Sequence, residues 1–128
     1  MSSNKTIIST AHAPAAVGPY SQAVKVGGFV FSAGQIPLVP ETGKLVDGGI
    51  DVQTRQVMEN LSQVLKAAGA TLENVVKATI FVTDLGNFAT INQVYGSYFS
   101  QEPPARSTVQ VAALPLGANV EIEVIAVV

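Results

Sequence analysis

The stretch VEIEVIAVV, residues 120–128, is the most hydrophobic run of the chain, and its side chains alternate in character. Successive side chains of a β-strand point to opposite faces of a sheet. One face of this strand is wholly apolar and suits contact with helices; it comprises Val120, Ile122, Val124, Ala126 and Val128. The other face carries Glu121 and Glu123 among apolar residues. We therefore expect a two-faced strand over residues 119–128.

Further strands are predicted from short β-branched or aromatic runs that are bounded by turn residues. The first lie at residues 5–9 and 22–34, and Gly27-Gly28 inside the second range makes a tight hairpin turn. The run NVVKATIFVT, residues 74–83, predicts another strand. Alternation puts Val76, Ala78, Ile80 and Val82 on one of its faces and Val75, Lys77, Thr79, Phe81 and Thr83 on the other. A strand over residues 106–113 is expected to precede the last one.

Two segments have helical spacing. After Asp51, which we expect to be the N-cap, apolar residues recur every three or four positions until Gly69 ends the helix. A second helix is expected over residues 88–99, with an apolar stripe of Phe88, Ile91, Tyr95 and Tyr98. The Gly- and Pro-rich segment 34–49 is expected to be an irregular surface loop. The predicted order is β-β-β-α-β-α-β-β, an α+β fold with both helices on one face of the sheet.

The strand before the last one extends the two-faced pattern. Val109 and Val111 are expected to share the apolar, helix-covered side. Arg106, Thr108 and Gln110 are then expected on the opposite side, which they share with the glutamates of the last strand. This second face is too apolar for water and too charged for a monomer's core. We expect it to form a subunit interface lined with polar sites.

Length and composition favour one domain in an oligomer. A chain of 128 residues suits a single domain spanning residues 1–128. Charged residues make up 12% of the chain and apolar residues 48%, whereas soluble domains average about 25% charged residues. So few charges cannot readily cover a monomer, and we expect substantial buried subunit surfaces instead.

Charge and residue types argue against several classes of protein. The formal net charge is -2, and the seven Lys and Arg residues are far apart in sequence, which disfavours nucleic acid as the main partner. The absence of cysteine excludes disulfides and cysteine metal sites, and the single histidine, His12, disfavours a histidine-rich metal centre. The N-terminal segment lacks the apolar core of a signal peptide. No run of apolar residues approaches the length of about 18 that a membrane-spanning helix needs. A soluble cytoplasmic protein with no membrane partner is expected.

The stretch PPARSTV, residues 103–109, places Arg106 shortly after two prolines at the head of a strand. A guanidinium offers two parallel N–H donors, which match a planar carboxylate, and the backbone N–H of Thr108 would assist the same ligand. The prolines stiffen the approach to this position. A structural ion pair of Arg106 with Glu121 or Glu123 explains the same pattern, and the sequence leaves both explanations open.

Three other positions are candidates for a site. Burial between Val120 and Ile122 would raise the pKa of Glu121, whereas a nearby Arg106 would lower it, so the direction stays open. Gly18 and Pro19 form a bend that aims the hydroxyl of Tyr20, although such tyrosines more often serve packing. SAGQIP, residues 32–37, ends a strand at Gly34, where backbone can approach a ligand closely.

Standard catalytic signatures are missing from the sequence. It has no phosphate loop, no dinucleotide fingerprint and no Ser–His pair with suitable spacing. The residues alone therefore predict a small carboxylate-binding α+β oligomer and no particular reaction.

Four segments together resemble the RidA family, the YjgF-type reactive-intermediate deaminases. They are APAAVGPYSQAV, SAGQIP, VVKATIFVTDLGNFATINQVY and PPARSTVQVAALPLGANVEIEVIAVV, and the match runs from about residue 5 to residue 128. The resemblance implies a chorismate-mutase-like fold and a homotrimer with clefts between neighbouring subunits. It also implies hydrolysis of 2-imino acids, such as 2-iminobutanoate and 2-iminopropanoate, to 2-keto acids and ammonia. No metal or organic cofactor is implied.

The resemblance assigns roles to matching positions. It implies that Arg106 of PARS grips the substrate carboxylate and that Glu121 of VEIE positions and activates the attacking water. Tyr20 of GPY would close the cleft and contact the substrate. Asn92 of ATINQVY matches an asparagine near the family's site. Further hydrogen bonds would come from Gly34 and from the backbone of Thr108.

Two positions depart from the family pattern. Many members have serine where this chain has Ala33, and cysteine where it has Thr108. The first change removes one side-chain hydrogen bond at a substrate-binding position, worth about 1 kcal/mol. The second removes any thiol chemistry and leaves the backbone N–H in place.

Two other functions remain under consideration. A non-catalytic protein of the same fold would sense or bind a small carboxylate, but such a binder needs only Arg106 and not Glu121. Ribonuclease or translation-inhibitor activity is attached to some relatives, and the acidic balance of the chain disfavours it.

Overall fold

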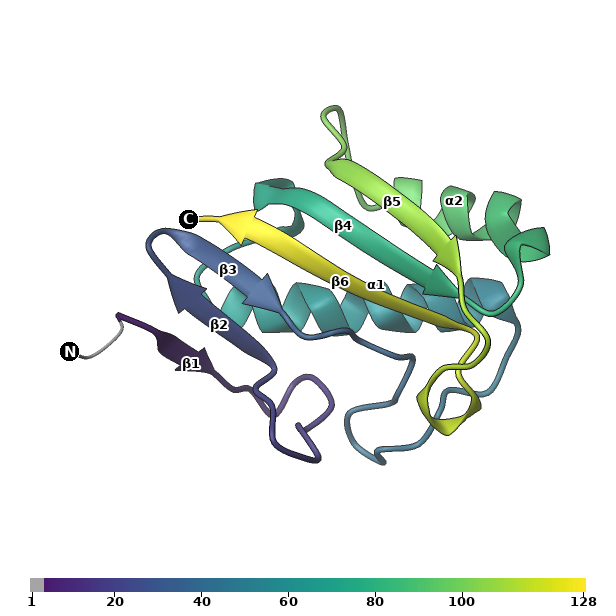
Figure 1. Ribbon diagram of the computed structural model, residues 1–128, viewed down its shortest axis with the longest axis horizontal. Helices are drawn as coiled ribbons and strands as arrows, with labels where there is room; N and C mark the ends of the chain where they lie inside the picture. Colours follow the sequence, from purple (N-terminus) through teal and green to yellow (C-terminus); the bar gives the residue numbers. More distant parts are fainter. Residues whose placement is uncertain (1–3) are drawn as a thin grey trace.

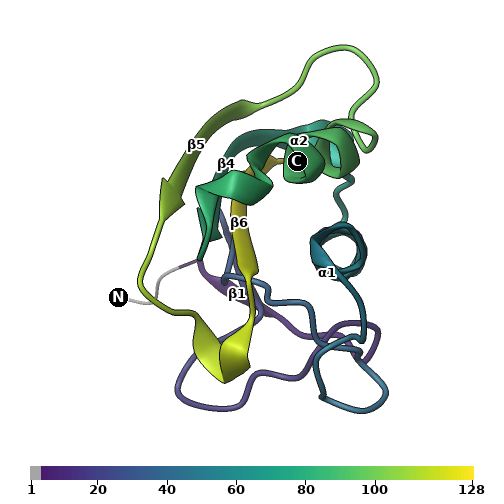
Figure 2. The ribbon, with the colours of Figure 1, turned by 90° about the vertical axis from the view of Figure 1, so that its right-hand side faces the viewer.

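The computed structural model describes residues 4–128 of the chain. Within this range one sheet carries both α-helices on the same face, so the structure has two layers (Figure 1, Figure 2). This confirms the predicted order of elements and the placement of the helices. The strands are β1 (Thr6–Ile8), β2 (Ala23–Val26), β3 (Phe29–Ser32), β4 (Val75–Val82), β5 (Ala105–Gln110) and β6 (Val120–Val127), and the α-helices are α1 (Ile50–Ala67) and α2 (Phe88–Gly96).

The C-terminal strand lies in the middle of the sheet. The strand order is β1-β2-β3-β6-β4-β5. Neighbouring strands are antiparallel, except that β4 and β5 are parallel. A parallel pair cannot be joined by a tight turn and needs a crossover, which α2 supplies here. As a result β5 forms one edge of the described sheet.

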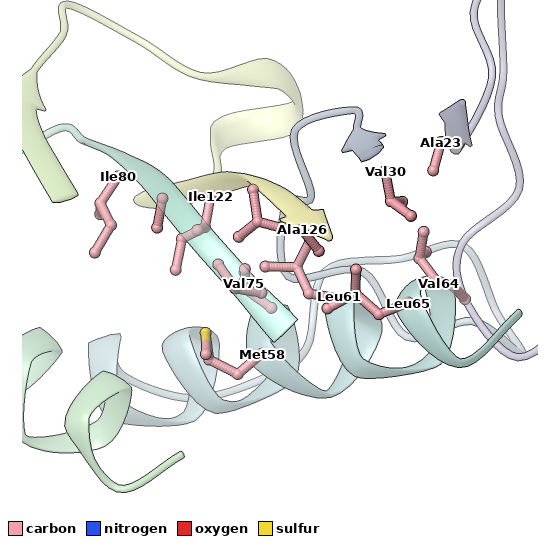
Figure 3. Close-up of a cluster of buried hydrophobic side chains, with 14 of the residues drawn as sticks. Ala23, Val30, Met58, Leu61, Val64, Leu65, Val75, Ile80, Ile122 and Ala126 are labelled. Atoms are coloured by element: carbon pink, nitrogen blue, oxygen red, sulfur yellow. The ribbon is translucent and has the colours of Figure 1, made fainter. Parts of the chain in front are cut away.

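The core lies between α1 and the sheet. Figure 3 shows Leu61 and Leu65 of α1 in one cluster with Ile122 and Ala126 of β6, and all four side chains are fully buried. The β6 members are the alternate apolar positions that the sequence pattern assigned to the helix-covered face. Contact between the apolar stripe of α1 and this face of β6 therefore forms the centre of the hydrophobic core.

The hairpin between β2 and β3 turns at Gly27 and Gly28, as predicted. Their φ angles are 56° and 81°. A two-residue hairpin loop matches the twist of its strands when both residues have positive φ, and glycine adopts this conformation without a steric cost.

The predicted start of α1 is wrong by two positions. The N-cap is Gly49, and Asp51 lies in the first turn, where its negative charge still interacts favourably with the helix dipole. The chain enters the helix through Gly48, whose φ is 143°, so the backbone is helical before the first polar side chain. At the other end Lys25 of β2 donates a hydrogen bond to the carbonyl of Ala68 at 3.1 Å, and Gly69 follows with φ 83°. This confirms the predicted end.

The second α-helix is shorter than predicted, because it ends at Gly96 rather than at residue 99. Beyond it, the N–H groups of Tyr98 and Phe99 donate to carbonyls three residues back, at 3.1 and 3.2 Å. These tight turns keep the apolar stripe on one side, which explains why the spacing predicts a longer helix. Neither α-helix in residues 4–128 has the length and hydropathy needed to cross a membrane.

The predicted faces of β5 are reversed in the structure. Arg106 is paired with Ala78 and Thr108 with Ile80. Because paired residues of neighbouring strands point to the same face and Ala78 and Ile80 are fully buried, Arg106 and Thr108 point toward the helices. Val109 is paired with Phe81 on the open face and is 43% exposed.

A β-bulge also disturbs the predicted alternation in β4. The pairing with β6 shifts between Val75 and Lys77. Val75 therefore lies in the core, whereas Val76 is 43% exposed. The extra residue reverses the predicted alternation at Val75 and Val76, and the alternation from Lys77 onward is as predicted.

Truncation of a core side chain tests the central role of the α1–β6 contact. We expect Leu61→Ala to lower the free energy of unfolding by about 2–5 kcal/mol, because it leaves a cavity in a fully packed core. Urea unfolding followed by circular dichroism measures this change. Lys66→Ala, at an exposed position on the same helix, is the control and should shift the free energy by less than about 0.5 kcal/mol. Equal effects of the two substitutions would contradict this account of the core.

Candidate active site

A cavity of about 550 Å³ opens at one end of the sheet. It lies between the N-terminal loop, the segment that follows β3, the turn before β6 and the first residues of β6. Four predicted site residues line it: Tyr20, Ala33, Gly34 and Glu121. The remaining walls are mostly apolar and include Val17, Ile36, Leu38 and Leu116. The cavity therefore combines one carboxylate with a largely apolar wall.

A β-bulge shapes the segment that carries Gly34. Phe31 is paired with Ile125 of β6, and Gln35 is paired with Ile122. The first segment advances by four residues (31 to 35) while β6 advances by three (125 to 122), so one residue is extra. Inside the bulge the backbone N–H of Val124 donates to the Ser32 hydroxyl at 2.9 Å instead of to a carbonyl. Such a bulge bends the strand and re-aims its side chains, here beside Glu121.

Gly34 makes room for the Glu121 side chain. A β-carbon built on Gly34 would lie 2.8 Å from the carboxyl carbon of Glu121 and closer still to its Oε2 atom. Real contacts of this kind are never so short, so any larger residue must displace the carboxylate. The sequence predicted that a ligand approaches the backbone closely at this glycine. In the structure the group that lies against Gly34 is the carboxylate of Glu121.

The surroundings of Glu121 raise its pKa above the ordinary value. Burial is the main cause, because it disfavours the charged form, and the like charge of Glu123 adds to it. The question that the sequence left open is thereby answered. Arg106 does not lower this pKa within one chain, because its side chain points to the other face of the sheet.

The loop that carries Tyr20 is held by a buried glutamine that sequence reasoning missed. Gln22 is 3% exposed. Its side-chain amide donates to the carbonyls of Thr10, Ala13 and Pro14 and accepts from the N–H of Thr10. Tyr20 itself is 51% exposed, and its hydroxyl accepts a long hydrogen bond of 3.4 Å from the N–H of Val17. The ring is thus placed at the mouth of the cavity on a fixed loop.

A second anchor holds the other wall. Asn60 of α1 is buried and donates to the carbonyl of Leu38 at 2.9 Å. Gln35 exchanges two backbone hydrogen bonds with Ile122, at 2.9 and 3.1 Å. The sequence spacing of Asn60 and Gln35 gave no sign of these anchoring roles, because their hydrogen-bond partners are backbone groups far away in the sequence.

The other predicted site residues form a separate cluster below α2. Arg106 donates from Nη1 to Oδ1 of Asn92 at 2.7 Å. The Thr108 hydroxyl is buried and has no hydrogen-bond partner within residues 4–128. The backbone N–H of Thr108 points away from β4. The N–H of Val111 donates to the carbonyl of Val82 in β4 at 2.8 Å. Since backbone N–H groups alternate in direction along a strand, the N–H of Thr108, three residues earlier, faces the outer edge of the sheet.

The two clusters lie on opposite faces of one sheet. Glu121 is paired with Phe81 on the open face, whereas Arg106 is paired with Ala78 on the helix-covered face. The ion pair of Arg106 with Glu121 or Glu123 is therefore not formed within one chain. By the same geometry a single chain does not direct the arginine and the glutamate into one cavity.

Metal ligands are not grouped in either cluster. Across residues 4–128 no three His, Asp or Glu side chains come together as a metal site would require. Arg106 and the edge N–H of Thr108 are donors suited to an anionic ligand.

Comparison with known proteins adds the family. A family model described as Endoribonuclease L-PSP matches residues 10–128. The protein Reactive Intermediate Deaminase A, chloroplastic, from Arabidopsis thaliana is 53% identical over 95% of this chain, which spans 65% of that protein's length. The chain belongs to the RidA family.

Two further comparisons cover nearly the whole chain. The 2-iminobutanoate/2-iminopropanoate deaminase of Mus musculus is 50% identical over 96% of this chain and 91% of its own length. The crystal structure of E. coli TdcF with bound serine superposes with a TM-score of 0.92 at 45% identity, covering 96% of this chain and 98% of that one.

Substitution of the bulge glycine tests its link to Glu121. We expect Gly34→Ala to displace the Glu121 carboxylate while the fold is retained, because the overlapping atoms belong to the end of a flexible side chain. The unfolding temperature should change little, and a crystal structure of the variant should show Glu121 in a different rotamer. An unmoved carboxylate would contradict the steric argument. Gly96→Ala, where an added β-carbon meets no atom within 4 Å, is the matched control.

The raised pKa of Glu121 predicts a pH-dependent change in stability. A carboxyl whose folded pKa exceeds its unfolded value of 4.5 favours folding at pH below that value and loses this contribution as pH rises through the folded pKa. Glu121→Gln should therefore raise the unfolding temperature near neutral pH, and the gain should disappear near pH 4. Calorimetry at several pH values measures this difference. Glu41→Gln, at an exposed loop position, should show no such trend, and a Glu121→Gln curve parallel to wild type would refute the prediction.

Proposed function

We propose that this protein is a hydrolytic deaminase that converts reactive 2-imino acids into 2-keto acids and ammonia. Its substrates would be 2-iminobutanoate, 2-iminopropanoate and their enamine tautomers. Relatives that are about half identical over nearly the whole chain carry this activity in their names. The observation that carries the proposal is the pair of clusters described above: a guanidinium with free donors, and a carboxylate of raised pKa in an apolar cavity.

The proposal includes a homotrimer of chorismate-mutase-like subunits with an active site in each cleft between neighbours. Within one chain the two clusters face away from each other, so the Arg106 cluster of one subunit would meet the Glu121 cavity of the next. The open face of the sheet supports association, since it exposes large apolar side chains. These are Phe29 (45%), Phe31 (42%), Val109 (43%) and Val127 (36%). An apolar face of this kind is rare on a monomer.

Binding would begin with the substrate carboxylate. Arg106 would hold it through two parallel N–H donors, and the edge N–H of Thr108 would add a third hydrogen bond. Gly34 and Ala33 would contact the substrate from the other side of the cleft, and Tyr20 would close the opening. The apolar walls would receive the alkyl side chain and exclude excess water.

Hydrolysis would then proceed by attack of water on the imine carbon. Glu121 would accept a proton from the water as the C–O bond forms and pass it to the imine nitrogen, which gives a carbinolamine. Glu121 would then transfer the hydroxyl proton to the amine nitrogen as the C–N bond breaks, which releases ammonia and the 2-keto acid. A base works best when its pKa lies near the working pH. Burial raises the pKa of Glu121 within one chain, and the neighbouring subunit's Arg106 would act in the opposite direction. Positioned acid–base catalysis of this kind contributes about 10²–10⁴-fold.

The second candidate is a non-catalytic protein that binds a small carboxylate. The related structure of TdcF with bound serine favours this reading, since serine is a small carboxylate ligand. A protein that only binds a carboxylate would, however, have no use for Glu121 or for Gly34, which makes room for the Glu121 side chain. Ribonuclease activity, suggested by the name of the family model, is less consistent with a net charge of -2. The absence of nucleic-acid and membrane partners and the cytoplasmic location remain predictions from the sequence.

A competition assay tests the deaminase proposal. Threonine dehydratase, or an L-amino-acid oxidase, generates the imine while semicarbazide traps it, and the protein competes with the trap. We expect wild type to reduce semicarbazone formation, and we expect Arg106→Ala and Glu121→Gln to lose about 10²-fold or more of this effect. The matched controls are Arg55→Ala and Glu41→Gln, which alter exposed residues outside the cavity.

Each outcome of this assay assigns the function. Loss in both site variants, with unfolding temperatures that show they remain folded, supports hydrolysis and both roles. No effect of wild type on the trap rejects the deaminase for these substrates and leaves the carboxylate-binding protein as the leading account. Loss in Arg106→Ala alone would reject the role of Glu121 as base.

A further inference from the structure

The guanidinium of Arg106 contacts two aromatic rings of α2. Its Cζ atom lies 5.4 Å from the ring centroid of Phe88 and 5.2 Å from that of Tyr95. Both distances fall within the range of about 6 Å in which a cation is attracted to the face of a ring. These contacts come in addition to the hydrogen bond from Nη1 to Asn92.

One face of α2 supplies all three partners. Phe88, Asn92 and Tyr95 are separated by four and then three residues, which places them along one side of a helix. Seven residues correspond to about 10.5 Å of helix rise. The guanidinium lies just over 5 Å from both ring centroids and donates to Asn92, whose position in the helix lies between those of Phe88 and Tyr95.

This arrangement leaves most of the guanidinium available for a ligand. Arg106 has five N–H donors, and the side-chain hydrogen bond described above uses one of them, on Nη1. The rings interact through their faces and occupy no N–H donor. A planar carboxylate can thus still bind through two parallel N–H groups. An arginine that is already ordered loses less side-chain entropy when the ligand binds.

We propose that Phe88 and Tyr95 are positioning residues that hold Arg106 in the orientation in which it binds the substrate carboxylate. This inference rests on the proposed function for the identity of the substrate. The two rings touch the arginine and not the reacting atoms. They therefore act on substrate affinity, and the chemical step at Glu121 does not depend on them.

The ring of Tyr95, rather than its hydroxyl, performs this role. Tyr95 is 4% exposed, and its hydroxyl has no hydrogen-bond partner among residues 4–128. Burial raises the pKa of Tyr95, against a smaller opposing effect of Arg106, so the ring that meets the cation is the neutral phenol. Tyr95→Phe keeps the ring and should keep the affinity, whereas Tyr95→Leu removes the ring and should not.

Phe88 offers the cleaner test because it is 39% exposed, so its replacement should not leave a cavity in the core. Tyr95 also packs against Phe99, with ring centroids 4.9 Å apart, so a leucine there can disturb the core. The primary pair is therefore Phe88→Leu and Phe88→Tyr, which differ in the presence of a ring. Leu85→Ala, at an exposed apolar position just before α2, is the matched control.

Two measurements on the 128-residue chain separate this inference from the deaminase proposal. One is the dissociation constant of 2-oxobutanoate, the keto-acid product, by isothermal titration calorimetry. The other is the concentration dependence of imine hydrolysis, which gives KM and kcat separately. We expect Phe88→Leu and Tyr95→Leu to weaken binding and raise KM by about tenfold, with kcat within about twofold of wild type. Phe88→Tyr, Tyr95→Phe and Leu85→Ala should remain near wild type.

A double substitution makes the test specific for Arg106. If the rings act through the arginine, Phe88→Leu should have no further effect on binding in an Arg106→Ala background. Equal effects of Phe88→Leu with and without Arg106 would overturn the inference, and so would wild-type KM and affinity in both leucine variants. A loss of kcat with unchanged KM would also overturn it.

The remaining outcomes distinguish the two proposals. If wild type binds 2-oxobutanoate and does not hydrolyse imines, the same pattern of dissociation constants still supports the positioning role while the deaminase function is rejected. If wild type neither binds the keto acid nor hydrolyses the imine, both proposals fail.

Discussion

The alternation of β6 is the constraint on which the rest of the structure depends. Because its side chains point in turn to the two faces of the sheet, Ile122 must enter the core if Glu121 is to remain outside it. The strand lies in the middle of the sheet, so a shift by one residue would expose the core face and bury two glutamates. The register that buries Ile122 against α1 therefore also sets the position of the carboxylate.

The same constraint separates the two halves of the candidate site. Arg106 lies on the helix-covered face of β5, and Glu121 lies on the open face of β6. Folding of one chain therefore places the guanidinium and the carboxylate on different faces of the sheet. Within one chain this separation keeps Glu121 away from the positive charge of Arg106, and burial raises its pKa. It also links the proposed activity to association, because only a neighbouring subunit can bring a guanidinium to the cavity. The apolar open face supplies a reason for such association.

Local patterns predicted the elements well and their ends and faces less well. The glycines at 27 and 28 and at 69 have backbone conformations that few other residues adopt, so the hairpin and the end of α1 were predictable from residue type. Asp51 failed as a cap because Gly48 and Gly49 let the chain become helical before the first polar side chain. For β5 the alternation was correct and its assignment to faces was reversed. Arg106 resembles a surface residue, and only the packing of α2 over β5 provides a covered place for it.

The sequence by itself determined the order of the elements, the two-faced strands and the residue types of the candidate site. These properties depend on periodicity and backbone preference, which act between neighbours along the chain. Tertiary structure alone decided which residues meet. The bulge that places Gly34 beside Glu121, the buried amides of Gln22 and Asn60, and the side of the sheet on which Arg106 lies all depend on partners many residues away. Pairing of distant segments sets these contacts, and no local pattern carries that information.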